Sequence, residues 1–185
     1  PGDFTRTGNR KDFPLETEEP TVLQALEREK VPVYSVGKID DIFGRQGIAE
    51  SNHTPDNASS QEAVEAFYAR KEHGLIFANF IDFDMLYGHR RDPKGYAGAL
   101  EQTDAWLDTV LPRMAEGDVL ILAADHGNDP TYEGTDHTRE YVPLLVYGPG
   151  RTAEALGIRK GFYDMAQSIA TFFDIPPMPR GVSFL

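Results

Sequence analysis

An apolar run that ends abruptly in titratable side chains constrains this chain more than any other feature. Residues 119–124 have the length and composition of a buried strand, and Asp125 and His126 follow them directly. Another imidazole, His137, stands just before a second apolar run at residues 142–147. The segment between the two runs is rich in Gly, Asn, Asp, Pro and Thr and has no helical period.

This connection predicts how the two strands pair. A parallel crossover needs about a dozen or more residues and normally contains a helix. We therefore expect the second strand to run back antiparallel beside the first. That arrangement brings His137 to the same edge as Asp125 and His126, so that three possible metal ligands converge.

Strands and helices alternate in the rest of the predicted pattern. We expect helices at the apolar stripe after Pro20, after a capping box that starts at Ser59, and near the C-terminal end of the chain. Segment 37–48 contains three glycines and is expected to be a loop. The pattern predicts an α/β fold, in which a mostly parallel sheet is flanked by helices and includes one antiparallel strand. The other expected elements are strands at 31–36 and 75–84 and a helix at 95–114.

The strand expected at 75–84 also ends in a possible metal ligand. Its last residue is Asp84, and His89 follows five residues later. Ligands of open α/β sheets gather beyond the carboxyl ends of the strands, so these two residues should lie near the first three. Carboxylate oxygen and imidazole nitrogen without sulfur suit Zn²⁺ or Mn²⁺ better than Mg²⁺ or Ca²⁺. Five ligands are about one short of two three-ligand sites, the arrangement that clamps a transferred phosphoryl group.

Each of these residues also has an ordinary structural explanation. Aspartate ends many strands, and a single histidine such as His137 is more often a surface loop residue. It is the combination of two carboxylates and three imidazoles that indicates a metal centre. His53 and His73 have no such context, and we expect both to be solvated.

Composition excludes several functional classes. The formal net charge of −12 argues against a general nucleic-acid surface and suits a protein that gathers divalent cations. No apolar run approaches the roughly 20 residues of a membrane span, and the first residues do not form a secretory signal. The absence of cysteine excludes disulfides and thiolate metal sites and fits a cytoplasmic protein.

Several motifs, in this order and spacing, resemble those of the phosphopentomutase family in the alkaline phosphatase superfamily. The resemblance covers essentially the whole chain. Related cofactor-independent phosphoglycerate mutases share a DHG-type motif but lack the Gly-His-Arg-Arg-Asp element. The matching segments are Phe-Thr-Arg-Thr-Gly-Asn-Arg at 4–10, Gly-Lys-Ile-Asp-Asp-Ile-Phe at 37–43, Asn-Phe-Ile-Asp-Phe-Asp at 79–84, Gly-His-Arg-Arg-Asp at 88–92, Ala-Asp-His-Gly-Asn-Asp-Pro at 124–130 and Gly-Thr-Asp-His-Thr-Arg-Glu-Tyr-Val-Pro-Leu-Leu at 134–145.

The resemblance implies an isomerase that interconverts ribose 1-phosphate and ribose 5-phosphate, and likewise the deoxyribose phosphates, in nucleotide metabolism. It implies two Mn²⁺ ions. Asp84, His89 and His137 would hold one ion, and Asp125 and His126 would supply part of the site of the other. In this family a phosphothreonine donates its phosphoryl group to the incoming sugar phosphate, and a sugar bisphosphate forms as intermediate and serves as activator.

Two parts of the family pattern have no counterpart in these 185 residues: the nucleophilic threonine and the first metal-binding aspartate. We therefore nominate no catalytic residue. We expect residues 1–19 to be the end of a cap domain with its linker, and residues 20–185 to be the C-terminal half of the metal-binding core. The expected partners are the N-terminal part of the same protein and a small-molecule sugar phosphate. We expect the chain alone to be inactive and to bind metal incompletely.

Three cationic residues are candidate contacts for a substrate phosphate. Arg6 and Arg10 offer guanidinium groups that bind phosphate with two hydrogen bonds, and Lys38 offers a point charge. Each has a competing explanation as a solvated surface charge. Two alternatives for the whole chain stay open. It could be another metalloenzyme of the superfamily, such as a phosphoglycerate mutase or phosphatase, or a non-catalytic metal-binding module.

Overall fold

A computed structural model describes residues 14, 15 and 17–185. The chain divides into two compact units. Unit 1 contains the described residues up to Asn79 together with Leu156–Leu185, and unit 2 contains Phe80–Ala155. Among the described residues, no helix is both long enough and apolar enough to span a membrane.

Unit 1 is built on a parallel sheet of three strands in the order β2-β1-β3. The central strand β1 (Val33–Val36) is buried along its whole length, as a strand between two neighbours and two helical layers should be. The flanking strands are β2 (Glu50–Asn52) and β3 (Leu75–Ala78). Since Val36 pairs with both Asn52 and Ala78, the three carboxyl ends lie at one edge.

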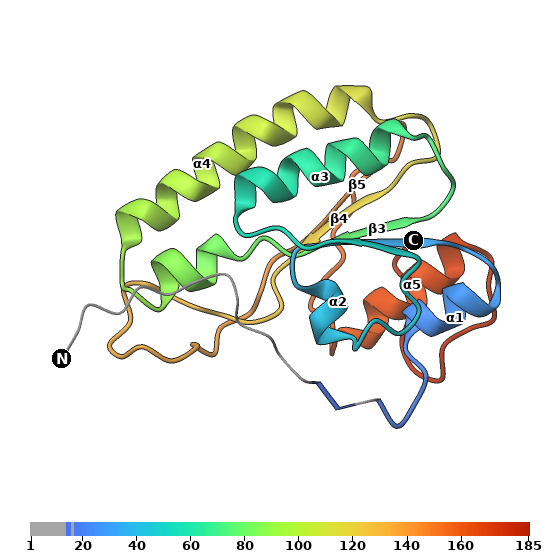
Figure 1. Cartoon of the computed structure of the whole chain (residues 1–185), viewed down its shortest axis with the longest axis horizontal. Helices are drawn as coiled ribbons and strands as arrows, with labels where there is room; N and C mark the ends of the chain where they lie inside the picture. Colours follow the sequence, from blue (N-terminus) through green and yellow to red (C-terminus); the bar gives the residue numbers. More distant parts are fainter. Residues whose placement is uncertain (1–13, 16) are drawn as a thin grey trace. The chain divides into compact units, whose positions relative to one another are not determined.

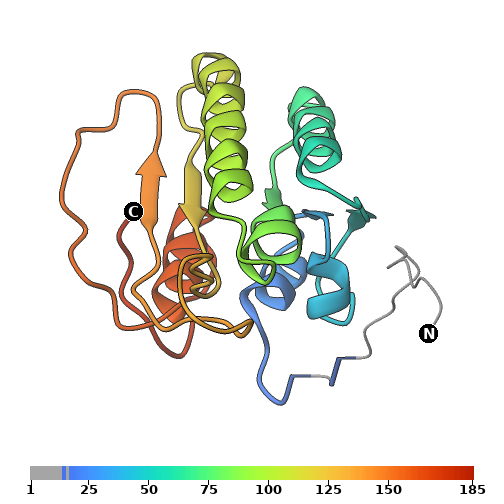
Figure 2. The ribbon, with the colours of Figure 1, turned by 90° about the vertical axis from the view of Figure 1, so that its left-hand side faces the viewer.

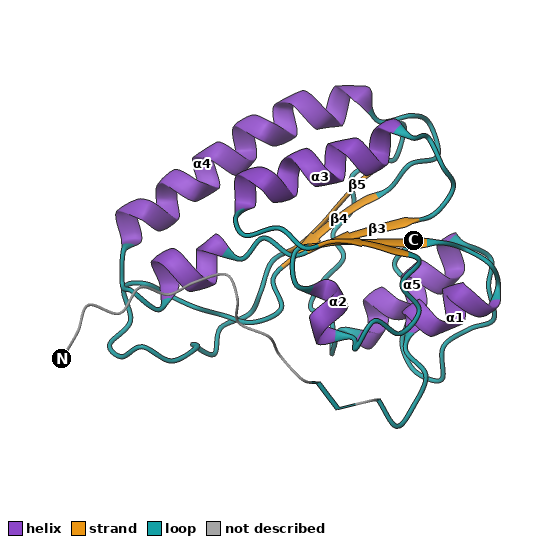
Figure 3. Cartoon of the chain, viewed as in Figure 1, coloured by secondary structure: helices purple, strands orange, loops and turns teal. Residues whose placement is uncertain are grey.

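Helices cover both faces of this sheet (Figures 1 and 3). Helix α3 (Asn57–Ala69) packs on one face, where its Ala63 and Phe67 contact Tyr34 and Val36 of β1. On the other face α1 (Val22–Arg28) places Leu23 and Leu26 against Val33, next to residues of α5 (Tyr163–Phe172). Alternate β1 residues thus face opposite layers, as the pleat requires.

The helix starts follow local hydrogen bonding. Thr21 and Gln24 form a capping box at α1. The capping box predicted at Ser59 is wrong, because Asp56 caps α3 instead. The Asp56 carboxylate accepts hydrogen bonds from the Ser59 backbone N–H at 2.8 Å and from its hydroxyl at 2.7 Å, so Ser59 lies inside the first turn. These two bonds lower the pKa of Asp56.

Unit 2 contains an antiparallel pair of strands, β4 (Leu120–Ala123) and β5 (Leu144–Tyr147). Figure 2 shows their arrows pointing in opposite directions, with the long helix α4 (Pro93–Val110) in the same unit. The predicted return of the second strand is therefore confirmed. Helix α4 begins earlier than predicted because Asp92 caps it, and it ends in the short 3₁₀ turn η2 (Leu111–Arg113).

Three other sequence predictions were wrong in detail. The strand expected at 75–84 ends at Ala78, and Phe83–Gly88 forms the π-helical turn η1. The loop expected at 37–48 contains the short helix α2 (Ile39–Ile42), and β2 was not predicted at all. The predicted α/β class holds, but the antiparallel strand belongs to a separate two-stranded sheet in the hydrogen-bond pattern.

Candidate metal centre

Asp84 and His89 lie at the two ends of one turn of η1. The backbone N–H of His89 donates to the Asp84 carbonyl at 3.1 Å, which is the five-residue bond of a π-helix. A spacing of five residues therefore corresponds to about one turn, and the two side chains meet on the same side. The distance from Asp84 Oδ1 to His89 Nε2 is 3.2 Å. Asp84 and His89 are therefore brought together by a π-helical turn, and not by the end of a strand as predicted.

A second contact orients the His89 ring. Its Nδ1 lies 2.6 Å from the carbonyl oxygen of Thr135. A carbonyl only accepts hydrogen bonds, so Nδ1 is the donor in this contact, and Nε2 is the ring nitrogen that faces Asp84. A backbone carbonyl that holds the far nitrogen of an imidazole is the usual support for a metal-binding histidine.

His137 reaches the same carboxylate oxygen from the loop between β4 and β5. Its Nε2 lies 3.2 Å from Asp84 Oδ1. An isolated antiparallel bridge between Gly127 and Thr138 extends the pairing of the two strands into this loop, and the Thr138 N–H donates to the Gly127 carbonyl at 3.1 Å. This bridge sets the position of His137, the neighbour of Thr138.

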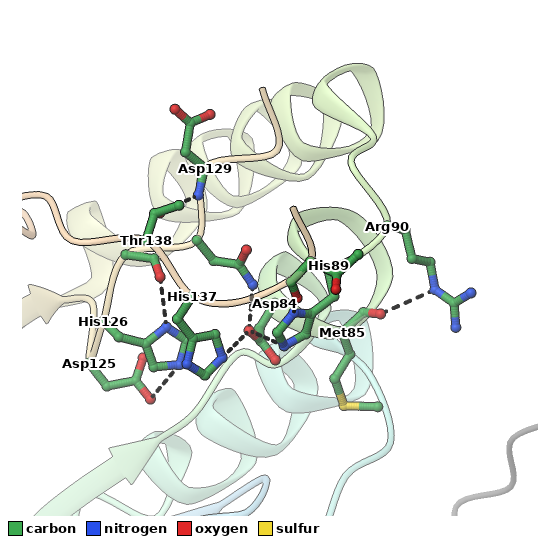
Figure 4. A network of polar contacts seen from close by, with 12 residues as sticks. Asp84, Met85, His89, Arg90, Asp125, His126, Asp129, His137 and Thr138 are labelled. Carbon is green, nitrogen blue, oxygen red and sulfur yellow. Dashed lines mark hydrogen bonds and ion pairs between the residues drawn. The ribbon is translucent and has the colours of Figure 1, made fainter. Parts of the chain in front are cut away.

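His126 and Asp125 continue the group from the end of β4 (Figure 4). The rings of His126 and His137 stack with centroids 3.7 Å apart and an angle of 18° between their planes. Asp125 Oδ2 lies 3.7 Å from His126 Nε2, although the Asp125 side chain is 68% exposed. The five residues thus form a continuous series of contacts in the order Asp125, His126, His137, Asp84, His89.

Asn128 is a site residue that the sequence reasoning missed. Its side-chain N–H donates to Asp84 Oδ1 at 2.6 Å. The approach depends on Gly88, because a Cβ at that position would lie only 2.4 Å from the Asn128 side-chain carbon. The signal was present in the sequence, since Asn128 stands two residues after His126 in the motif that carries the ligands.

Further hydrogen bonds tie together the loop that carries His137. The hydroxyl of Thr138 accepts from the backbone N–H of Asp129 at 2.8 Å and donates to Glu140 at 2.7 Å. Burial and the carboxylates of Glu140, Asp129 and Asp84 together raise the pKa of Tyr96. The region therefore carries a negative potential that favours cations.

The donors fit a divalent cation. Asp84, His89 and His137 each offer one ligand atom, and these atoms all lie within 4.8 Å of one another. The Asp84 and His137 side chains are 31% and 48% exposed, so an ion has a path from solvent. One carboxylate and two imidazoles around an accessible position match the donor set of Zn²⁺ or Mn²⁺ sites.

The remaining predicted residues lie elsewhere or cannot be placed. Lys38 is in unit 1, where it precedes α2. Arg6 and Arg10 fall outside the described residues. His73 is exposed, as predicted, and its ring packs edge-on against Phe173.

His53 is exposed, as predicted, but two carboxylates that the prediction did not consider lie close to it. Its Nδ1 lies 3.6 Å from Asp40 and 3.7 Å from Asp41 in unit 1. Asp40 and Asp41, which were expected in a loop, lie on the short helix α2. The rule that ligands gather at the carboxyl ends of parallel strands would have found all three, had β2 been recognised.

Comparison with known proteins gives this arrangement a context. Residues 5–177 match the family described as the Metalloenzyme superfamily. A phosphopentomutase of Caldanaerobacter subterraneus is 52% identical over all of this chain and 47% of its own length. A phosphopentomutase of Anaeromyxobacter sp. is 51% identical over 95% of this chain and 45% of its own length. The chain therefore spans just under half the length of these curated relatives.

A solved structure has the same fold at low sequence identity. The chain superposes on a phosphoglycerate mutase of Leishmania mexicana, crystallised at low cobalt concentration, with a TM-score of 0.68. The match covers 87% of this chain and 38% of that protein, at 18% identity. At this identity the likeness establishes the fold alone.

Proposed function

This chain belongs to the metalloenzyme superfamily, and on that premise we propose that it is part of a phosphopentomutase. The reaction would move a phosphoryl group between the 1- and 5-oxygens of ribose or deoxyribose. The observation that carries the proposal is the identity of about half of all residues, over nearly the whole chain, with proteins named phosphopentomutase.

The geometry of unit 2 supports a metal-dependent transfer. We assign Asp84, His89 and His137 as ligands of one divalent cation, and Asp125 and His126 as part of a second site. Of the possible ions we favour Mn²⁺, because a mixed oxygen and nitrogen donor set suits it. When bound, such cations neutralise the charge on the oxygens of a transferred phosphoryl group.

The protein's own groups hold these ligands ready. The Thr135 carbonyl orients the His89 ring, and Asn128 holds Asp84 Oδ1 between the two imidazoles. Donors that are already oriented cost little reorganisation during the reaction. We propose Lys38, Arg6 and Arg10 as contacts for the substrate phosphate, a sugar bisphosphate as activator and the cytoplasm as the site of action.

The 185 residues contain no counterpart of the nucleophilic threonine that the family resemblance implies, so we propose that this chain alone does not turn over. Its remaining ligands and the nucleophile would come from the rest of a longer polypeptide. Catalysis by the isolated chain at the rate of the complete protein would contradict this part of the proposal.

The test of the function is an assay of the complete gene product that contains this chain. Ribose 1-phosphate, 2-phosphoglycerate and an aryl phosphate are offered separately with Mn²⁺. We expect ribose 5-phosphate to form and a His89→Ala variant to lose this activity. Product from 2-phosphoglycerate alone would identify a phosphoglycerate mutase instead, and release of inorganic phosphate from the aryl phosphate alone would identify a phosphatase.

A further inference from the structure

Unit 1 contains a second group of donors, the Asp40 cluster, made of Asp40, Asp41 and His53. The topology brings these residues together. Strands β1 and β2 are parallel neighbours that end side by side at Val36 and Asn52, and the Gly37 N–H donates to the Asn52 carbonyl at 3.0 Å. Asp40 and Asp41 follow β1 on α2, and His53 follows β2. All three therefore stand at the edge where α/β sheets bind ligands.

The donor atoms of the cluster face one another. Nδ1 of His53 lies 3.6 Å from Asp40 Oδ1 and 3.7 Å from Asp41 Oδ2. One ligand atom from each of the three residues lies within 4.8 Å of the other two. A single ion of ordinary size placed among them needs only small side-chain rotations to reach bonding distances of about 2.0–2.2 Å.

An independent observation points to a missing ligand at this place. Asp40 is 2% exposed, and its Oδ1, the oxygen that faces His53, is buried with no hydrogen-bond partner among the described residues. Its other oxygen faces Arg45 at 3.7 Å, but that arginine side chain is 80% exposed. Buried carboxylate oxygens in proteins are hydrogen-bonded, paired or bound to a cation, so this one calls for a partner.

We propose that Asp40 Oδ1, Asp41 Oδ2 and His53 Nδ1 bind a divalent transition-metal cation, with Mn²⁺ and Zn²⁺ as the candidates. Two carboxylates and one imidazole form a mixed donor set that these ions accept. The His53 side chain is 46% exposed, which gives an ion access, while Asp40 forms the floor of the site. This site shares no residue with the metal centre of unit 2, so it goes beyond the proposed function.

The competing explanation needs no metal. A protonated His53 could lie between the two carboxylates as an ion pair. The two explanations differ in stoichiometry, because only the first adds a metal ion to unit 1. They also differ in the spectroscopic response of His53 to a paramagnetic ion.

The experiment removes the metal centre of unit 2 and counts what remains. The chain carrying Asp84→Ala, Asp125→Ala, His126→Ala and His137→Ala, which keeps His89 as the single predicted ligand of unit 2, is titrated with Mn²⁺ and separately with Zn²⁺ by calorimetry. We expect one ion to remain bound to each chain. Adding His53→Gln should weaken that binding by at least roughly 10–100-fold. Loss of a residue that only hydrogen-bonds to a metal ligand already has an effect of this size. Asp41→Asn should have a similar effect, and His73→Gln is the matched histidine control.

Two further measurements, of NMR line widths and of urea unfolding, separate metal binding by His53 from a structural role. Mn²⁺ should broaden the ring resonances of His53 and leave those of His73 unchanged. The His53→Gln chain should unfold at the same urea concentration as its parent, because the side chain is nearly half exposed. Either the absence of bound ion in the chain that lacks the four unit 2 ligands or an unchanged affinity after His53→Gln overturns the proposal. Failure of the unit 2 assignment is separate, since it would appear as unchanged total binding when Asp84, Asp125, His126 and His137 are replaced.

Discussion

The two units differ in where their apolar residues and their chemistry lie. Unit 1 contains most of the buried apolar side chains among the described residues, and Leu23, Leu26, Val33 and Val36 are completely buried. In unit 2 the buried apolar residues that the structure describes are Ile81 and Ala99. Unit 2 nevertheless brings together all five metal ligands that the sequence predicted.

The difference indicates that the candidate metal centre is positioned by polar contacts more than by packing. Asp84 is held by two imidazoles and one amide, and His89 by a backbone carbonyl. Apolar substitutions in unit 1 should therefore change stability, whereas polar substitutions in unit 2 should change metal binding. The first three experiments below test this separation, and the fourth measures the contribution of a polar helix cap in unit 1.

The largest effect is expected from a cavity in unit 1. Leu26→Ala removes a completely buried side chain that packs against β1. We expect the free energy of unfolding to fall by about 2–5 kcal/mol, the usual cost of such a change in a core. Urea denaturation measures it. The matched control is Leu100→Ala on α4, whose side chain is 53% exposed and which should change stability by less than about 0.5 kcal/mol. Similar costs for the two variants would contradict the division of apolar burial.

The next effect concerns the metal centre alone. His137→Ala removes one of the two imidazoles that face Asp84 Oδ1. We expect Mn²⁺ binding at unit 2 to weaken by more than about 100-fold, because loss of a ligand costs more than loss of its support. Calorimetry compares this variant with His73→Ala, which replaces an exposed histidine. A large loss of unfolding free energy in His137→Ala would show that the centre also supports the fold.

A smaller effect is expected from Asn128, which is hydrogen-bonded to the predicted ligand Asp84. Asn128→Ala removes the amide that donates to Asp84 Oδ1 at 2.6 Å. We expect Mn²⁺ affinity to fall by roughly 10–100-fold while the number of bound ions stays the same. Asn52→Ala on the exposed strand β2 is the matched control. An unchanged affinity in Asn128→Ala would mean that Asp84 keeps its position without this bond.

The smallest effect concerns a helix cap in unit 1 and its response to acid. Asp56→Ala removes the cap of α3 and should cost about 1 kcal/mol of unfolding free energy at pH 7. Bonds from Ser59 hold the pKa of Asp56 below its ordinary value of 3.8, so the charged form is favoured in the folded state. This contribution is complete above the unfolded pKa and is lost as pH falls through the lower folded pKa.

Asp56→Asn tests the sign of this pH dependence. Asparagine also caps helices but does not titrate in this range. Urea denaturation at pH 7 and below pH 3 should show that the wild-type chain loses more stability on acidification than the Asp56→Asn chain. Equal losses would exclude a contribution from the Asp56 carboxylate.

The predictions from sequence were most accurate where local chemistry is decisive. The polar connection after His126 is too irregular for a crossover helix, which predicted the antiparallel return of β5. They failed where one backbone pattern competes with another. Residues 80–84 continue the apolar character of β3, but the chain leaves the sheet after Ala78 and forms a π-helical turn at Phe83.

The sequence by itself determined the types of ligand, their order along the chain and the family to which the chain belongs. Only the tertiary structure decided which atoms meet. It placed Asn128 on Asp84 across 44 positions of sequence and left Asp40 Oδ1 buried beside His53. The physical reason is that such contacts depend on strand ends, helix turns and burial acting together, and no local pattern of residues encodes that combination.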